Sequence, residues 1–179
     1  MSEVAAREAR KLRREPWDRF ALKALLVLTL ILTIGAYVCD RYRIGIDDQL
    51  ALCLPPYRWY LIDTFDRRVA RDRLVAFAAT AAMAPYFRPG QIVIKQVAGV
   101  PGDQVSVGAT GTSINGVAIP HSDPALAKTL GRRPADFARE QVIAEGHVWV
   151  MGATRDSFDA RYWGPLPAGQ VVGRAYALF

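Results

Sequence analysis

A lysine within an apolar strand is the first residue of this sequence with clear chemical potential. Lys95 lies in the segment Ile92–Val97 (IVIKQV), which is rich in β-branched residues and predicts a largely buried strand. A lone lysine in such a strand usually points outward to solvent. An inward lysine would be desolvated, and desolvation disfavours the ammonium form, so that the neutral amine can accept a proton from a hydroxyl or thiol. Lys95 is therefore a candidate general base for nucleophile–base chemistry.

Three segments of the chain resemble motifs of the type I signal peptidase family. Residues 94–103 (IKQVAGVPGD) are similar to the segment that carries the catalytic lysine of that family. Residues 152–165 (GATRDSFDARYWGP) are similar to its C-terminal box, and residues 71–77 (RDRLVAF) resemble the strand that precedes the lysine segment. The three segments keep the order of the family, and the resemblance covers roughly residue 53 to the C-terminus.

The resemblance implies roles for four residues. Lys95 matches the general base, and Ser157 matches the serine that hydrogen-bonds and orients it. Asp159 matches an aspartate that the conjugative-transfer (TraF-type) branch is regarded as including in its catalytic set, and Arg161 matches the arginine that follows. The alternative for Asp159 and Arg161 is a structural ion pair that holds two strands together.

Cys53 stands where the family carries its nucleophilic serine. The segment after the apolar N-terminal run reads Cys53-Leu54-Pro55-Pro56, and no serine occurs between Asp40 and Lys95. A thiol loses its proton more easily than a hydroxyl, which suits an amine base. Some conjugation-associated peptidases are similar in carrying Cys-Leu-Pro here, so Cys53 is the predicted nucleophile. The alternative is a substituted, inactive site in which Cys53 is a small buried residue.

Three other departures favour the TraF-type branch over the housekeeping enzyme. Ala51 has no hydroxyl where signal peptidases often place an oxyanion-hole serine, which leaves the backbone N–H of Cys53 as a donor. The C-terminal box opens Gly152-Ala153-Thr154 instead of Gly-Asp-Asn and is one residue shorter before Ser157. The segment between Asp103 and His147 is short, which implies a reduced second subdomain.

The elements that must position these residues are mostly strands. Strands are predicted from apolar or alternating runs bounded by turn residues. A hairpin is predicted at Ser113–Ile119, because Asn115-Gly116 suits a type I′ turn. Residues 125–138 are polar and weakly helical. The fold class is therefore a mostly β, signal-peptidase-like domain with a reduced second subdomain. The remaining predicted strands are Tyr57–Asp63, Leu74–Ala78, Gln91–Ala98, His147–Met151 and Gln170–Leu178.

An uncharged apolar run, Ala24–Cys39, precedes this domain and predicts a membrane-spanning helix. Including residues from Phe20 onward lengthens it to a full span, with Lys23 able to extend to the headgroups. A buried core helix and a cleaved signal peptide are the alternatives, but no small-x-small cleavage site closes the run. Positive residues cluster before it and favour a cytoplasmic N-terminus. The predicted parts are a basic cytoplasmic segment (1–19), a signal anchor (20–39) and an extracytoplasmic domain (40–179).

Composition narrows the function classes further. Half of the net charge of +6 lies before the apolar run, and no interleaving of aromatic and basic residues marks a binding groove, which argues against a nucleic-acid surface. His121 and His147 lack metal-ligand spacing, so neither a metal nor another cofactor is expected. A disulfide between Cys39 and Cys53 is disfavoured because Cys39 ends the apolar run, and a thiol-redox protein is disfavoured because C-x-x-C is absent.

These observations predict a single-pass protein of the bacterial inner membrane with a periplasmic peptidase domain. By its resemblance to the TraF-type branch, it would cleave or cyclise exported pilin-type precursors for conjugative transfer, using Cys53, Lys95 and Asp159. The expected partners are the exported precursor, membrane lipid and the conjugative secretion machinery. The alternative is a catalytically inactive, membrane-tethered component that holds pilin subunits for a type IV secretion apparatus.

Overall fold

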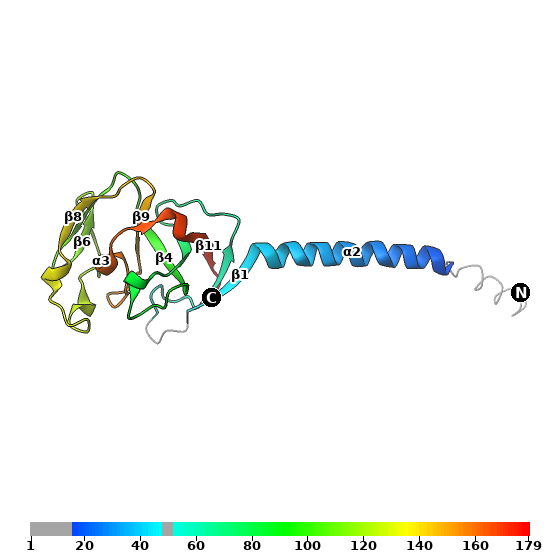
Figure 1. The fold of residues 1–179 in the computed structure, drawn as a ribbon, viewed down its shortest axis with the longest axis horizontal. Helices are drawn as coiled ribbons and strands as arrows, with labels where there is room; N and C mark the ends of the chain where they lie inside the picture. Colours follow the sequence, from blue (N-terminus) through cyan, green and yellow to red (C-terminus); the bar gives the residue numbers. More distant parts are fainter. Residues whose placement is uncertain (1–15, 48–51) are drawn as a thin grey trace, which may run out of the picture. The chain divides into compact units, whose positions relative to one another are not determined.

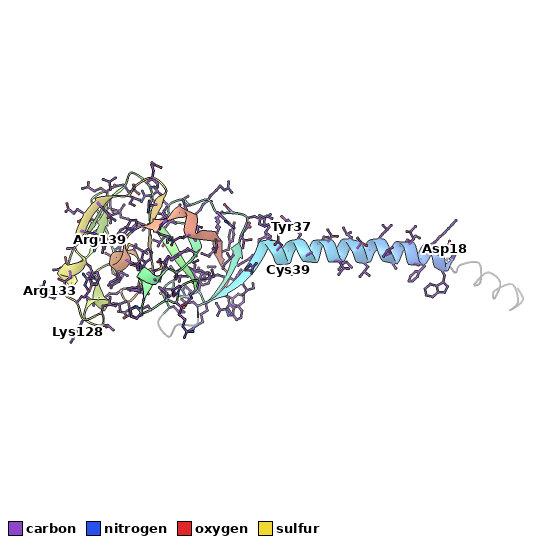
Figure 2. The ribbon with its side chains drawn as sticks, in the orientation of Figure 1. Asp18, Tyr37, Cys39, Lys128, Arg133 and Arg139 are labelled. Carbon is purple, nitrogen blue, oxygen red and sulfur yellow. The ribbon has the colours of Figure 1, made fainter. Side chains whose placement is uncertain are left out.

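The computed structural model describes residues 16–47 and 52–179, which fall into two units divided after Arg41. The first unit contains one described helix, α2 (Trp17–Arg41), with no buried residue (Figure 1). It is long and apolar enough to cross a membrane and contains the whole predicted anchor, residues 20–39. Cys39 lies on this helix (Figure 2), and neither it nor Cys53 forms a disulfide. Residues 1–15 of the predicted cytoplasmic segment, and Ala51, lie outside the described residues.

The second unit is built on an antiparallel sheet of seven strands. Their spatial order is β1-β2-β11-β3-β4-β9-β10. The strands predicted around residues 57–63, 74–78, 91–98, 147–151 and 170–178 are confirmed, whereas β1 and β10 were not predicted. The bounds are β1 (Tyr42–Ile46), β2 (Trp59–Asp63), β3 (Leu74–Ala78), β4 (Ile92–Gly99), β9 (His147–Met151), β10 (Leu166–Pro167) and β11 (Val171–Ala177).

Residues 104–142 form a smaller sheet and two turns of 3₁₀ helix. Its strand order is β7-β6-β5-β8, and Figure 1 shows β6 and β8 grouped apart from β4, β9 and β11. The predicted hairpin is confirmed, with positive φ at Asn115 (51°) and Gly116 (78°). The weakly helical segment contains only η2 and η3. The bounds are β5 (Gln104–Val107), β6 (Thr112–Ile114), β7 (Val117–Ile119), η2 (Ala125–Ala127), η3 (Pro134–Phe137) and β8 (Arg139–Val142). The other short helices are η1 (Ala81–Met83), α3 (Ala160–Trp163) and η4 (Ala168–Gln170).

The seven-stranded sheet curls strongly because one of its faces carries small residues. A methyl group added at Gly45 on β1 would lie 3.0 Å from Cδ1 of Ile94 on β4, although three strands separate β1 from β4 in the sheet. Ala76 and Ala175 are buried on the same face, and a methyl group at Gly173 would collide with the carbonyl of Asp63. These small side chains let the distant strands approach across a concave face.

The opposite face of the sheet carries the main hydrophobic core and also Lys95. Lys95 is directly opposite Val75 in the β3–β4 register, and paired residues point to the same side of a sheet. Val75 is fully buried in the core together with Val93 and Val97, which alternate with Lys95 along β4. Lys95 therefore points inward, with 1% of its surface exposed, and the outward orientation considered from the sequence is wrong.

Asp103 joins the two sheets at the turn before β5. Its carboxylate accepts hydrogen bonds from the Val100 amide (2.7 Å), from Arg71 (2.6 Å) and from Asn115 (2.8 Å). Burial works to raise the pKa of Asp103, but these hydrogen bonds and the charge of Arg71 outweigh it and hold the pKa below its usual value. The ionised form of Asp103 is therefore the one that connects the two sheets in the folded protein.

Asp103→Asn is expected to lower the free energy of unfolding by about 1–3 kcal/mol at pH 7. A carboxyl with a lowered folded-state pKa stabilises the fold above its unfolded-state pKa, near 4, and this stabilisation is lost as the pH falls through the folded-state value. The gap between the two proteins should therefore shrink at pH 3. Denaturant unfolding of the full chain in detergent at both pH values measures it. Glu145→Gln, at an exposed position, is the control, and a gap that widens in acid would contradict the expectation.

Candidate active site

Lys95 and Ser157 meet inside the second unit although 62 residues separate them in the chain. Nζ of Lys95 lies 2.8 Å from Oγ of Ser157, and both residues are almost completely buried. The aromatic ring of Phe87 lies on another side of the amine, 5.9 Å from Nζ to the ring centroid. Among the residues that the structure describes, no carboxylate forms an ion pair with Lys95. The serine hydroxyl is thus the polar group that fixes the direction of this amine.

Gly152 connects this pair to the main chain of Cys53. It directly follows β9, and a methyl group added to it would lie 2.6 Å from Cβ of Ser157 and 2.9 Å from the carbonyl oxygen of Cys53. The next amide, that of Ala153, donates to the same Cys53 carbonyl at 2.8 Å. The Cys53 main chain and Ser157 therefore lie against a single residue that has no side chain.

Cys53 lies in a partly apolar environment with an acidic neighbour. It is 5% exposed and packs with Leu54 and Tyr60. Its amide donates a long hydrogen bond of 3.4 Å to Oδ2 of Asp47, which follows β1. The pKa of Tyr60 is raised to about 12. Burial is the largest cause, followed by the negative charge of Asp47 and that of Cys53 when it is ionised. The backbone N–H that the sequence suggests as an oxyanion donor is thus in contact with a carboxylate.

Asp159 and Arg161 form an ion pair of 2.8 Å with neither side chain exposed. Asp159 caps α3 by accepting from the Arg161 amide, and its Oδ2 accepts from the amide of Gly152 at 3.0 Å. Burial works to lower the pKa of Arg161, but the hydrogen bond and charge of Asp159 outweigh it and raise that pKa. Among the described residues, Asp159 therefore contacts the amide of Gly152 and the side chain of Arg161.

Arg161 also donates to main-chain carbonyls around the site. The shortest of these bonds reach the carbonyls of Ser157 (2.7 Å) and Asp123 (2.9 Å), and longer ones reach Arg155 (3.3 Å) and Thr154 (3.4 Å). The guanidinium thus holds the loop that carries Ser157. The ion pair offered as the alternative from the sequence is present, but it lies at the start of α3 and does not join two strands. The catalytic role of Asp159 stays a prediction.

Arg161→Met is expected to lower the free energy of unfolding by about 3–5 kcal/mol, because Asp159 would remain as an uncompensated buried charge. Thermal or denaturant unfolding of the full chain measures this loss. Arg155→Met is the matched control, since the ion pair of Arg155 with Asp123 (2.7 Å) is exposed to solvent and such pairs contribute little. Equal losses in the two variants would contradict the assigned role of Arg161.

Gly152→Ala is expected to destabilise the protein by about 1–3 kcal/mol, because the added methyl group must displace Ser157 or the Cys53 carbonyl. It should also lower peptidase turnover, because displacing Ser157 changes the orientation of Lys95. Gly169→Ala is the control, since nothing lies within 4 Å of a methyl group at that position. An alanine variant at 152 with normal stability and turnover would refute the close packing of this site.

Sequence reasoning missed Asp47, Asp123 and the role of Gly152. Gly152 carries a detectable signal, since it directly follows an apolar strand at the start of the C-terminal box. Asp47 and Asp123 lie outside the three matched motifs, and nothing in the sequence places them near the site. Within residues 16–47 and 52–179, no group of three or more histidine, cysteine or acidic side chains could hold a metal ion.

Comparison with known proteins decides the family. The family model described as signal peptidase, peptidase S26, matches residues 17–179. The chain belongs to the signal peptidase S26 family. A probable signal peptidase I-2 of Synechocystis is 28% identical over 194 residues, covering 100% of this chain and 82% of that protein. A probable conjugal transfer protein TraF of Sinorhizobium fredii is 30% identical over 165 residues, covering 85% of this chain and 84% of its own length.

The S26 membership extends over both units of the chain. A crystal structure of a signal peptidase I from Enterococcus faecalis is 25% identical, covers 64% of this chain and 99% of its own, and superimposes with a TM-score of 0.38. The relatives of this chain include both signal peptidases and TraF conjugal transfer proteins. The strands and the single apolar helix of the structure confirm the expected mostly β domain preceded by one apolar helix, and the family model confirms that the chain is signal-peptidase-like.

Proposed function

We propose that this S26 protein is a membrane-anchored endopeptidase that cleaves or cyclises exported pilin-type precursors during conjugative transfer. Cys53 is the proposed nucleophile and Lys95 the general base. Ser157, Asp159 and Arg161 are positioning residues. The substrate class rests on the similarity to proteins named as TraF conjugal transfer proteins.

The observation that carries the proposal is the buried contact between Lys95 and Ser157, at 2.8 Å. A structural lysine would normally be exposed or paired with an acid. Here the amine of Lys95 contacts the neutral hydroxyl of Ser157, and Gly152 lies against both Ser157 and the main chain of Cys53. A proton acceptor whose direction is fixed by a serine, with Gly152 lying against both that serine and the main chain of a thiol-bearing residue, supports nucleophile–base chemistry.

The proposed reaction has two steps with balanced proton transfers. The neutral amine of Lys95 takes the thiol proton of Cys53, and the thiolate attacks the scissile carbonyl to form an S–C bond. Lys95 then gives this proton to the leaving amine as the C–N bond breaks, which leaves a thioester. Water, or an amine of the product itself, attacks the thioester while Lys95 accepts the proton. The C–S bond then breaks, and Lys95 returns this proton to the departing thiolate of Cys53. Water yields a linear acid, and the internal amine yields a cyclic amide.

The proposed location is the bacterial inner membrane, with the N-terminus cytoplasmic and residues 40–179 in the periplasm. Support comes from α2, which is long and apolar enough for one span, and from the basic residues that precede it in the sequence. The proposed partners are membrane lipid, the exported precursor and the conjugative secretion machinery. Neither a nucleic acid nor a cofactor is part of the proposal.

A non-catalytic binding role is the second candidate, and one observation favours it. Cys53 is nearly buried beside Leu54 and Tyr60, and its amide is in contact with the Asp47 carboxylate. A small buried thiol with a main-chain partner is also what a structural cysteine looks like. In that case the protein would hold pilin subunits for a type IV secretion apparatus without cleaving them.

The test of the proposed function is a processing assay with the full chain in membrane vesicles. Pilin-type precursors and ordinary secretory precursors are supplied separately, and products are identified by mass spectrometry. We expect processing of the pilin-type set, and a cyclic product would be lighter than the linear one by one water. Processing of ordinary secretory precursors alone would overturn the conjugative role, whereas binding without processing would favour the second candidate.

A further inference from the structure

A group of arginines surrounds one carboxylate at the end of the seven-stranded sheet. Asp66 lies 3.0 Å from Nε of Arg68 and 3.9 Å from both Arg73 and Arg174. The amide of Arg174 also donates to the Asp66 carbonyl at 2.7 Å. The hydrogen bonds and charge of Arg68, together with the charge of Arg73, lower the pKa of Asp66 to about 2. We call Arg68, Arg73 and Arg174 the arginine cluster.

The arginine cluster has more positive charge than its carboxylates neutralise. Asp66 is the shared partner of all three guanidinium groups, and their side chains remain 81%, 34% and 30% exposed. The neighbouring Asp63 is 4% exposed and accepts a hydrogen bond from the amide of Phe65. Arg67, next to Asp66 in the chain, is exposed and adds a further positive charge. A net positive surface of neighbouring guanidinium groups is thus presented to solvent.

The strand register relates Arg174 of the arginine cluster to Tyr42, at the start of the second unit. Tyr42, the first residue after α2, is paired with Asp63 on β2, and Asp63 is paired with Arg174 on β11. Two strand spacings correspond to about 10 Å, so Arg174 lies within that distance of the residue bonded to the helix. This distance holds for any orientation of the helix, because Tyr42 is joined to it covalently.

Aromatic side chains accompany the arginines. The guanidinium of Arg174 lies 4.6 Å from the ring centroid of Tyr176, and Phe65, beside Asp66 in the chain, is 58% exposed. A tyrosine ring next to a cationic side chain is typical of the headgroup region of a bilayer, where one end of the tyrosine is wet and the other apolar, and an exposed phenylalanine adds apolar surface there. The cluster therefore combines position, charge and aromatic neighbours.

We propose that the arginine cluster binds the phosphate of anionic phospholipids and fixes the orientation of the second unit on the membrane. Guanidinium groups bind phosphate through paired hydrogen bonds and are favoured over lysine for this purpose. Asp66 holds the three arginines together before the lipid arrives, which lowers the cost of ordering them. The proposal depends on α2 being a membrane anchor and is independent of the chemistry assigned to Cys53.

The test uses the full chain in lipid nanodiscs of phosphatidylcholine, with or without phosphatidylglycerol. Hydrogen exchange of the amides of Arg68 and Arg174, which bond to Asp66, is expected to slow about tenfold with the anionic lipid. Arg68→Gln/Arg174→Gln should abolish this protection, and Arg68→Gln alone, at an 81% exposed side chain, should reduce it without affecting the fold. Arg132→Gln/Arg133→Gln removes the same charge near η3 and should retain full protection.

Each other outcome overturns the proposal in a distinguishable way. Equal exchange in the two disc types, or protection that survives in the double variant at 68 and 174, excludes anionic lipid as the ligand of the cluster. Protection by inorganic phosphate in phosphatidylcholine discs would indicate a site for a soluble anion. Protection by an acidic peptide in the same discs would indicate a protein partner. A chain that does not enter the discs at all would refute the anchor instead.

Discussion

Lys95→Met is expected to lower kcat for precursor processing by about 10²-fold or more, the usual contribution of a general acid–base group. Methionine has a similar length but cannot accept a proton, so the thiol of Cys53 would lose its base and the leaving amine its proton donor. Because methionine is apolar and Lys95 is buried among valines, the free energy of unfolding should not fall. Turnover of a pilin-type precursor and denaturant unfolding, measured on the same preparation, separate the two effects.

Lys128→Met is the control for this experiment, because Lys128 is exposed beside η2 (Figure 2) and should tolerate the change. Ser157→Ala should give a smaller loss of kcat with little change in KM, since the hydroxyl orients the amine but transfers no proton. Processing by the Lys95 variant within a few-fold of the unmodified protein would show that Lys95 is not the base.

Cys53→Ala is expected to reduce turnover by about 10³-fold or more, as removal of a nucleophile does in other peptidases. Cys53→Ser should retain a measurable part of the activity, because the hydroxyl can use the same base but loses its proton less easily than a thiol. Alkylation of the thiol should inactivate the protein, and bound precursor should slow this inactivation. Processing rates of the three proteins, with and without an alkylating reagent, measure the effect.

Cys39→Ala controls for the other thiol, which lies on α2 and should not contribute to processing. Full processing by Cys53→Ala would refute the nucleophile. If Cys53→Ala and Cys53→Ser are both stable, both bind precursor and no form of the protein processes it, the binding role is correct instead. The alanine variant at Cys53 is therefore the experiment that most directly separates the two candidate functions.

The strands were predictable where apolar runs are continuous. β3 and β9 have the bounds expected from residues 74–78 and 147–151, because each is buried over most of its length. β5 and β8 were missed because their sequences, QVSV and REQV, are short and half polar. β1 was missed because its sequence, YRIGI, is short, contains a glycine and directly follows the apolar helix. Its pairing with β2 depends on a partner that local sequence does not reveal.

The site was predictable only in part. An inward lysine could not be inferred from the alternation of β4 alone, because the side on which Lys95 lies depends on which face the core covers. Its match to Ser157 came from motif resemblance, since no local rule joins residues 62 positions apart. The contact between Gly152 and Cys53 involves main-chain atoms, which leave no mark on side-chain chemistry. The Asp47 contact joins a strand end to a later loop and is likewise a tertiary feature.

The way in which Arg161 holds its loop has a consequence for how this protein can diverge. Its bonds reach the carbonyls of residues 123, 154, 155 and 157, and every amino acid supplies a carbonyl. The side chains at positions 153–156 are therefore not part of what the arginine recognises, and those positions can change in evolution while the loop keeps its path. The sequence Ala153-Thr154, unusual for the family box, is tolerated for this reason. Arg161 and Asp159 themselves have no such freedom, because they interact through their side chains.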